Sequence, residues 1–320
     1  MVPPNGSLRQ CQGMDPDGVD LSSVPRTPEG LLVRSELLAA GTSAMAIDRA
    51  LRSRQLQRVQ RGVYVPAGFS MTPHVIAMAA LRTVPEAIAT ISHQTAARLY
   101  EIPLASQPAA EHITVPFHAR RPHRGLLTVH CHDLEPDDIQ MVGGIPTTSP
   151  VRTAFDLLFG TDQLTALWAC ETAVRNGLVS LSDLQNRVGG AWRAPRAQQA
   201  RRLAASIEPR SESPLETAAR LVLVNGKLPI PRVQEPIVDE AGRVIYRLDL
   251  AYPEWLLGIE LDGRAIHEAP EAAFADRRRQ NYLAARGWTI LRFTWFDVTR
   301  RPAYVVSAVR DTLSQLKRAG

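Results

Sequence analysis

The sequence has few cysteines and no long apolar run. Its 320 residues include three cysteines, Cys11, Cys131 and Cys170, whose scattered positions match neither a disulfide framework nor a zinc motif. Cysteines used so sparingly are typical of a reducing compartment, so we predict a cytoplasmic protein. No apolar run reaches the roughly 18 residues needed to span a bilayer, and no basic-then-apolar signal opens the chain. We therefore expect no membrane partner.

Arginine is abundant and unevenly distributed. Lys and Arg together number 37 against 32 Asp and Glu, for a net charge of +5, and two long stretches carry arginines with no acid between them. These are Arg49, Arg52, Arg54, Arg58 and Arg61 in the first stretch, and Arg187, Arg193, Arg196, Arg201 and Arg202 in the second. Such stretches favour contacts with phosphate groups, although solvated helix faces explain them equally well.

The chain is long enough, and at 45% hydrophobic residues apolar enough, to bury more than one core. Its first segment is polar and rich in Pro, Gly and Asp, so we predict a disordered tail. The predicted divisions are a tail at 1–26, a DNA-binding domain at 27–68, a middle domain at 69–186, a basic linker that becomes helical at 187–207, and a last domain at 208–320.

Residues 27–68 predict two helices followed by a β-hairpin. A short helical pattern at 34–40 ends at Gly41, and Thr42 or Ser43 can cap a second helix that reaches Arg54. The residues at 56–60 and 63–66 then alternate as two short strands. A basic helix followed by a basic hairpin is how a winged helix-turn-helix contacts DNA, and a small helical cap without a ligand is the alternative.

The middle domain is predicted to be α+β. Strands at 111–116 and 126–132 flank a basic turn, and five of the eight histidines lie on or between these strands. His130 and His132 would share a strand face, where two imidazoles could coordinate zinc. No second pair with structural-zinc spacing accompanies them, so surface or phosphate-facing histidines are the main expectation. His93, in an Ala-rich helix, is predicted to lie in the core or at an interface.

The segment at 244–262 predicts a β-hairpin with one acidic face. If the turn is centred after Glu254, Asp249 lies opposite Glu260. One face then carries Arg247, Asp249, Glu260 and Asp262, and the other carries Leu248, Leu250, Leu257, Ile259 and Leu261. Like charges across a strand pair are destabilising unless a cation or solvent lies between them. Hard oxygen ligands in a tight group suit Mg²⁺ or Mn²⁺.

A helix is predicted to lead into this hairpin, from Ser213 to Asn225. Ser213 at the cap and Glu216 three residues later form a capping box, which gives Glu216 a complete structural role. The alternative makes Glu216 a fourth carboxylate that is aimed at the hairpin.

A further helix is predicted from Asp276 to Ala285, with Gly287 as its stop. Arg277 and Arg278 are expected to face solvent or DNA. Arg279 is expected to pair with Asp276 or with the acidic cluster, and a buried strand should follow at 288–293.

The order of these elements, a helix with Glu, a strand with Asp, a strand with Glu, then a helix and a strand, is that of the PD-(D/E)XK nuclease core. From Ser211 to Leu313 the chain resembles the endonuclease-like family related to very-short-patch-repair endonucleases. The likeness rests on E-S-P-L-E at Glu212, R-L-D-L-A-Y-P-E at Arg247, I-E-L-D-G at Ile259, D-R-R-R-Q-N at Asp276 and G-W-T-I-L-R-F at Gly287.

The resemblance implies a role for five residues. Asp249 would be the metal-binding aspartate, Glu260 and Asp262 the acids of the second strand, Glu216 the helix carboxylate, and His267 an active-site histidine. The nuclease core usually has Glu-x-Lys on the second strand, and here Asp262 stands in place of the lysine. The repair-endonuclease branch also lacks that lysine and uses a nearby histidine. A neutral His267 could accept a proton from water, or it could contact phosphate or close a loop after Gly263.

A second resemblance lies in the first half of the chain. The runs L-L-V-R-S-E-L-L-A-A-G and R-V-Q-R-G-V-Y-V-P resemble the N-terminal domain of AbiEi-type antitoxins, and a weaker likeness continues from Ile91 and Gly144. It implies binding to promoter DNA and a nucleotidyltransferase toxin as partner.

We therefore predict an α/β protein with an N-terminal winged helix-turn-helix, an α+β middle domain and a restriction-endonuclease-like core with a mixed sheet. The expected function is Mg²⁺- or Mn²⁺-dependent hydrolysis of DNA phosphodiesters. The alternative is a non-catalytic DNA-binding antitoxin or transcriptional repressor of a type IV toxin-antitoxin-like system.

Overall fold

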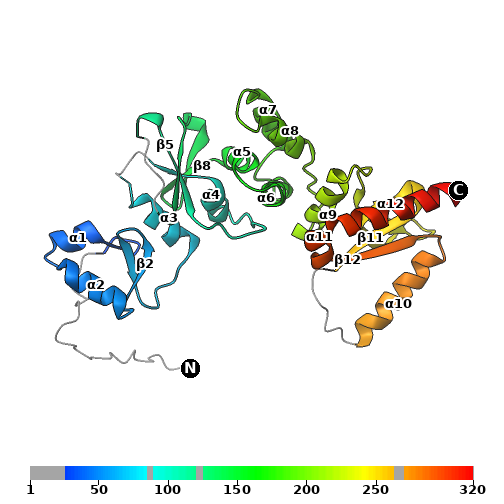
Figure 1. The fold of residues 1–320 in the computed structure, drawn as a ribbon, viewed down its shortest axis with the longest axis horizontal. Coiled ribbons are helices and arrows are strands. Elements are labelled where there is room, and N and C mark those ends of the chain that lie inside the picture. The colour runs from blue at the N-terminus through cyan, green and yellow to red at the C-terminus, as the bar shows by residue number, and fades with distance from the viewer. Residues whose placement is uncertain (1–25, 85–88, 120–124, 263–269, 320) are drawn as a thin grey trace, which may run out of the picture. The chain divides into compact units, whose positions relative to one another are not determined.

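The computed structural model describes residues 26–84, 89–119, 125–262 and 270–319 (Figure 1). Contacts divide the chain into two compact units. The first comprises the described residues of Met1–Leu99 and Pro108–Thr148, and the second comprises Tyr100–Gln107 and the described residues of Ser149–Gly320. Within the described residues, no helix combines the length and the apolarity needed to cross a membrane.

The first unit begins with two helices and a small antiparallel sheet. The elements are β1 (Leu32–Val33), α1 (Arg34–Ala39), α2 (Ala44–Arg52), β2 (Leu56–Gln60) and β3 (Val63–Pro66), with strand order β1-β3-β2. The Ser43 hydroxyl accepts a hydrogen bond from the Ala46 amide at 3.1 Å, which caps α2 as the sequence predicts. Ile47 is fully buried and Ala50 is buried beside it, so the other side of α2 faces solvent.

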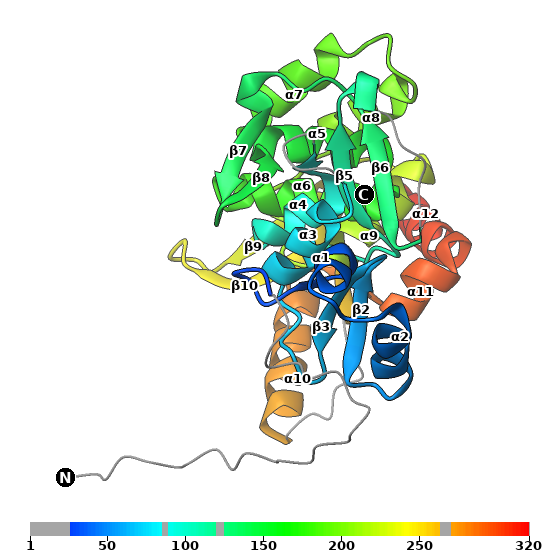
Figure 2. The same ribbon diagram turned by 90° about the vertical axis from the view of Figure 1, so that its left-hand side faces the viewer.

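The remainder of the first unit is a five-stranded sheet with helices (Figure 2). Its elements are α3 (Pro73–Leu81), β4 (Thr90–Ile91), α4 (His93–Leu99), β5 (Glu111–Val115), η1 (Phe117–Ala119), β6 (Leu127–Cys131), η2 (Pro136–Asp138), β7 (Ile139–Val142) and β8 (Ile145–Thr148). The strand order is β6-β5-β4-β8-β7. The two strands predicted around the basic segment are β5 and β6. They pair in parallel, so a crossover joins them and not a tight turn.

The second unit begins with four helices. These are α5 (Pro150–Gly160), α6 (Gln163–Arg175), α7 (Leu181–Gly190) and α8 (Ala197–Ala205). Glu171 of α6 is fully buried and forms an ion pair with Arg220, which lies on the helix that follows these four. The predicted basic linker at 187–207 is largely helical, because it contains α8 and the end of α7.

The C-terminal part of the second unit is a four-stranded mixed sheet with helices. Its elements are α9 (Pro214–Asn225), β9 (Arg232–Val238), β10 (Val244–Tyr252), η3 (Pro253–Trp255), β11 (Leu257–Asp262), α10 (Pro270–Ala284), β12 (Thr289–Thr294), α11 (Trp295–Arg300) and α12 (Pro302–Ala319). The strand order is β12-β11-β10-β9. Only β11 and β12 pair in parallel, so the sheet is mixed as predicted. An α/β fold with mixed sheets is confirmed.

Two apolar clusters pack against this sheet. One joins Leu250, Leu257 and Ile259 to residues of α9 and α12, and the other joins Leu248 and Ala251 to α10 through Leu283. Because neighbouring strand residues point to opposite faces, these clusters lie on the two sides of the sheet. The strands that carry the acidic residues therefore lie between α9 and α12 on one side and α10 on the other.

Candidate active site

A row of polar side chains crosses the four strands of the C-terminal sheet. Glu260 of β11 is in register with Arg292 of β12. Asp249 of β10 lies one residue beyond the Leu250↔Ile259 pair, which puts it level with Glu260, as the centred turn predicts. Gln234 of β9 lies between the residues that pair with Leu248 and Leu250, so it is level with Asp249. Arg292, Glu260, Asp249 and Gln234 thus come from four adjacent strands at one level.

The strand alternation breaks at Asp249. Leu250, Leu257, Ile259 and Leu261 pack together as predicted, whereas Leu248 packs in the cluster on the other side of the sheet. Gln234, on the neighbouring strand, has φ +52°, a left-handed conformation that reverses the direction of its side chain. The predicted single apolar face is therefore wrong at Leu248, because the sequence does not reveal this irregularity.

Asp249 is half-buried at the point where β10 leaves β11. The antiparallel pairing ends at Leu250 and Ile259, and the Asp249 Oδ2 atom accepts a hydrogen bond from the Leu261 amide at 2.8 Å. Burial raises the pKa of Asp249 to about 6, and the negative charges of Glu216 and Glu260 add to the rise. The Leu261 amide and Arg279 act in the opposite direction. A bound cation would therefore stabilise the charged form of the Asp249 carboxylate.

Glu216 reaches the same place from the first turn of α9. Its side chain accepts hydrogen bonds from the Ser213 hydroxyl at 2.8 Å, the Glu212 amide at 3.0 Å and the Gln234 amide group at 3.0 Å. The Ser213 hydroxyl in turn accepts from the Glu216 amide at 3.2 Å, so the predicted cap is present. The Glu216 carboxylate completes the cap with two hydrogen bonds, one from the Ser213 hydroxyl and one from the Glu212 amide. Glu216 thus caps the helix and also contacts the site through Gln234.

Glu260 is buried between two arginines. Its Oε1 atom lies 2.8 Å from Arg279 Nη2, and its Oε2 atom lies 2.8 Å from Arg292 Nη2. The first contact is an ion pair without hydrogen-bond geometry, so Oε1 is a buried oxygen with no hydrogen bond. Arg279 also donates to the Arg247 carbonyl oxygen at 2.7 Å. Arg279 therefore pairs with the acidic cluster, as predicted, and Arg292 pairs with Glu260 beside it.

The donor set fits a hard divalent cation held by few protein ligands. Within the described residues, no three of these carboxylates place oxygens within 4.8 Å of one another. Mg²⁺ is usually held by one or two carboxylates and keeps several waters, so a dense cage is unnecessary. The unsatisfied Glu260 oxygen and the half-buried Asp249 carboxylate supply two such ligands.

The other predicted site residues lie in different environments. Asp262, at the end of β11, is half-buried and in register with Thr294. His267 and the side chain of Asp276 lie outside the described residues. Arg277 and Arg278 are exposed on α10.

The predicted DNA-binding arginines of the first unit are all exposed. They are Arg49 and Arg52 on α2, Arg54 after it, Arg58 on β2, and Arg61 in the hairpin turn. Arg58 and Arg61 also line a hollow of about 790 Å³ together with Arg34 and Arg82. Asp48 also lines the hollow and lies 3.2 Å from Arg34, so the four guanidinium groups still leave it a net positive charge, which favours an anionic ligand.

Two site residues had escaped the sequence analysis. Gln234 gave no signal, because its position depends on the irregular backbone of β9. Arg292 did give one, since it is the single charge in an otherwise apolar strand, T-I-L-R-F-T.

Comparisons with known proteins place the C-terminal part of the chain in a family. Residues 236–313 match the family model REase_MTES_1575, a restriction-endonuclease-like family. The chain therefore has a C-terminal endonuclease-like domain, which suggests nuclease activity with DNA as substrate; such domains generally use divalent metals.

Longer matches come from Mycobacterium tuberculosis. The chain is 29% identical over 275 residues to the uncharacterized proteins MT2308 (strain CDC 1551 / Oshkosh) and Rv2248 (strain ATCC 25618 / H37Rv), which covers 86% of this chain and 98% of each relative. The crystal structure of the RV2827C protein superposes with a TM-score of 0.40 and 17% identity, covering 59% of this chain and 75% of that one.

Proposed function

We propose that the second unit is a metal-dependent DNA endonuclease whose cation is held by Asp249 and Glu260. One observation carries the proposal. Two acids from adjacent strands meet where the strands separate; one has a pKa raised to about 6 and the other has a buried oxygen without a hydrogen bond. A raised pKa and a buried oxygen without a hydrogen bond are features that occur at functional sites.

The surrounding residues position this pair. Glu216 fixes Gln234, which lies beside Asp249 on the neighbouring strand. A bound Mg²⁺ or Mn²⁺ would supply a polarised phosphate and a bound water of lowered pKa. Arg279 and Arg292 occupy the Glu260 oxygens, and their planar guanidinium groups match a phosphate as well as a carboxylate. We assign them to the DNA phosphate in the complex.

Two further acid–base roles belong to the proposal. Asp262 stands where related nucleases have a lysine, so it cannot supply a positive charge to the attacking water. His267 would accept the proton from that water. It follows β11 by five residues, a distance that a short connection can span.

DNA would be positioned by basic groups. We assign the two helices and the β2–β3 hairpin of the first unit to a winged-helix contact, with Arg49, Arg52, Arg54, Arg58 and Arg61 on phosphates. Arg277 and Arg278 of α10 would contact phosphates near the acids. These groups supply affinity without specifying a base sequence.

A specific observation favours a second function. Both Glu260 oxygens are neutralised by arginines. Asp262 also stands at the position where the nuclease core usually has a lysine. A site closed in this way would suit a non-catalytic DNA-binding antitoxin or repressor opposing a nucleotidyltransferase toxin. Such a protein would bind DNA without cutting it.

Plasmid nicking separates the two functions. Supercoiled and mismatched plasmid should be relaxed by the wild type with Mg²⁺ or Mn²⁺, and at least about 100-fold more slowly by Asp249→Asn, because a direct metal ligand matters more than outer-sphere groups. The matched control is Glu254→Gln, which removes an exposed acid from the same hairpin.

The control variant should relax plasmid at the wild-type rate. Equal nicking by the wild type and Asp249→Asn would contradict the mechanism. DNA binding without nicking by the wild type in either metal would leave the repressor function.

A further inference from the structure

Three histidines from separate elements meet on the sheet of the first unit. His112 is on β5 and His130 is on β6, and the parallel register pairs Thr114 with His130. The two histidines are thus two positions apart on neighbouring strands, so their side chains share one face of the sheet. His93 is the first residue of α4 and is separated by Ser92 alone from β4, which pairs with β5 on its other side.

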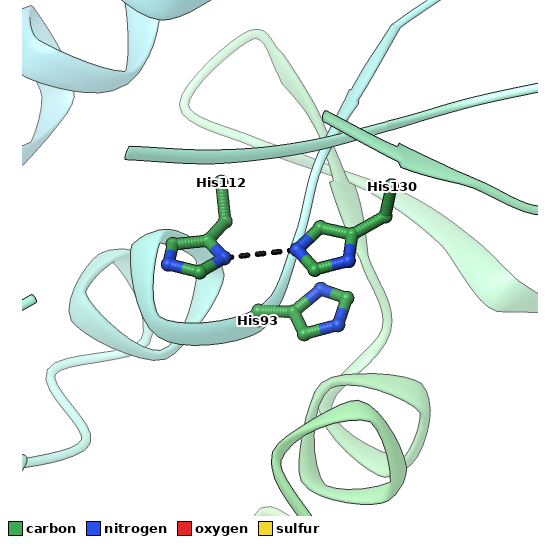
Figure 3. A group of neighbouring side chains, drawn as sticks. All are labelled: His93, His112 and His130. Carbon is green, nitrogen blue, oxygen red and sulfur yellow. Dashed lines mark hydrogen bonds between the residues drawn. The ribbon is translucent and has the colours of Figure 1, made fainter. Parts of the chain in front are cut away.

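The three rings lie against one another (Figure 3). His112 Nδ1 and His130 Nε2 are 2.9 Å apart and share a hydrogen bond. The His93 ring stacks on the His130 ring with centroids 3.6 Å apart and an interplanar angle of 12°. One ligand nitrogen from each ring lies within 4.8 Å of the others.

The backbone and a neighbouring hydroxyl hold His93 in this place. Its φ of +51° is left-handed, an uncommon conformation for a residue with a side chain. Its Nδ1 atom lies 3.0 Å from the Ser92 hydroxyl, which fixes the ring through one nitrogen. With Nδ1 turned toward Ser92, Nε2 is the nitrogen that we assign to the metal. A metal-bound histidine is usually oriented through its second nitrogen in the same way.

These distances are close to those of a tetrahedral metal site. With zinc–nitrogen bonds of about 2.05 Å, two ligand nitrogens lie roughly 3.3 Å apart. The pair of His112 and His130 must open by a few tenths of an ångström. The hydrogen that the two nitrogens share must also move to the other nitrogen of its ring, so that both lone pairs can turn toward the ion. His93 must turn about its Cβ–Cγ bond, because stacked rings direct their lone pairs side by side.

The ligand chemistry selects the ion. We propose that His93, His112 and His130 bind a divalent transition metal of the zinc class. Imidazole nitrogen suits Zn²⁺ and its neighbours, whereas Mg²⁺ takes oxygen ligands. Imidazole binds such an ion through the nitrogen lone pair of its neutral form.

The site differs from the histidine pair that the sequence indicates. His132 lies beyond the end of β6 and is exposed, with its ring edge-on to Phe117 at 6.0 Å. Within the described residues, no fourth His, Cys, Asp or Glu joins the group, so the fourth coordination position would go to solvent. Since the ligands come from β5, β6 and the start of α4, the ion would hold these three segments together.

The test measures zinc uptake by the full-length chain. Chelator-stripped protein is dialysed against Zn²⁺ in the presence of excess Mg²⁺, which occupies carboxylate sites, and bound zinc is counted by elemental analysis. We expect about one Zn²⁺ per chain. The His112→Ala and His130→Ala variants should bind zinc more than tenfold less tightly, and zinc should raise the melting temperature of the wild type but not of these two variants.

Two controls keep the result specific. His132→Ala removes an exposed histidine near the cluster and should bind zinc like the wild type. Asp249→Asn should also bind it normally, so failure of the nuclease proposal would leave this one intact. Equal zinc affinity in the wild type and both cluster variants, or no uptake by the wild type, overturns the proposal.

A spectroscopic measurement covers the case in which the variants do not fold. X-ray absorption of the zinc-loaded wild type should show imidazole nitrogens at about 2.0–2.1 Å. A shell without imidazole scattering would overturn the assignment.

Discussion

Two carboxylates of the second unit, Glu171 and Asp249, show how a structural acid differs from a functional one. Burial raises the pKa of both. Glu171 has a full set of partners, namely the Arg220 guanidinium, the Thr217 hydroxyl at 2.6 Å and the Glu208 amide at 3.1 Å. Asp249 has the Leu261 amide at 2.8 Å and two acids that repel it. The fold satisfies the first acid and leaves the second short of positive charge.

The difference indicates that satisfaction, and not burial alone, identifies a functional acid. A buried charge with a complete set of partners contributes to the specificity of the fold. A charge that lacks them destabilises the fold unless a ligand completes it. Substitutions at the two positions should therefore change stability in opposite directions.

The largest effect is expected at Glu171. The Glu171→Ala change leaves the Arg220 charge buried without its partner, and losses of this kind cost about 3–5 kcal/mol. Urea unfolding followed by circular dichroism measures the loss. The Glu254→Ala change at the exposed hairpin should cost less than about 0.5 kcal/mol. A loss below about 1 kcal/mol at Glu171 would remove the distinction between the two acids.

A smaller effect of opposite sign is expected at Asp249. Its folded-state pKa of about 6 lies above the unfolded value of about 3.9, so the folded state binds more protons between these pH values. Stability therefore falls as pH rises from about 4 to 6. In metal-free protein, Asp249→Asn should stabilise the fold by on the order of 2 kcal/mol at pH 7.5.

The pH dependence provides the control for this change. Below about pH 4 the aspartate is protonated in both states, so the wild type and Asp249→Asn should be equally stable. A variant that is less stable than the wild type at pH 7.5 would show that Asp249 is satisfied like Glu171.

The smallest effect is expected at Arg292. Its guanidinium neutralises Glu260 from a partly exposed position, and such pairs contribute less than about 1 kcal/mol. The Arg292→Gln change should tighten Mn²⁺ binding by up to about fivefold, as titration calorimetry can measure. Arg243→Gln, which removes the partner of Asp239, should leave Mn²⁺ affinity unchanged. Weaker Mn²⁺ binding by Arg292→Gln would show that the arginine supports the site.

Local patterns predicted much of the fold. The bounds of β2 and β3 are those expected, Ser43 caps α2, and Asp249 lies level with Glu260. Each of these features depends on residues close together in the chain, where turn chemistry and alternation decide the structure. The mixed C-terminal sheet was predicted as well, through the order of its elements.

The features that were missed depend on contacts between distant segments. The histidine cluster joins His93, His112 and His130 from three elements, whereas alternation on one strand suggested His130 with His132. The parallel pairing of β5 and β6 likewise has no short-range signal. Gln234 joined the site only because its backbone departs from strand geometry. The roles of Asp262 and His267 stay predictions.

Manganese binding tests the central claim most directly, that Asp249 and Glu260 form a site for a hard cation. The signal of free Mn²⁺ in electron paramagnetic resonance counts the ion left unbound during a titration. On the order of one Mn²⁺ per chain should bind to the wild type and to Glu254→Gln, and His112→Ala should not differ. Asp249→Asn should bind at least about 100-fold more weakly. Equal binding by Asp249→Asn and the wild type would contradict the account.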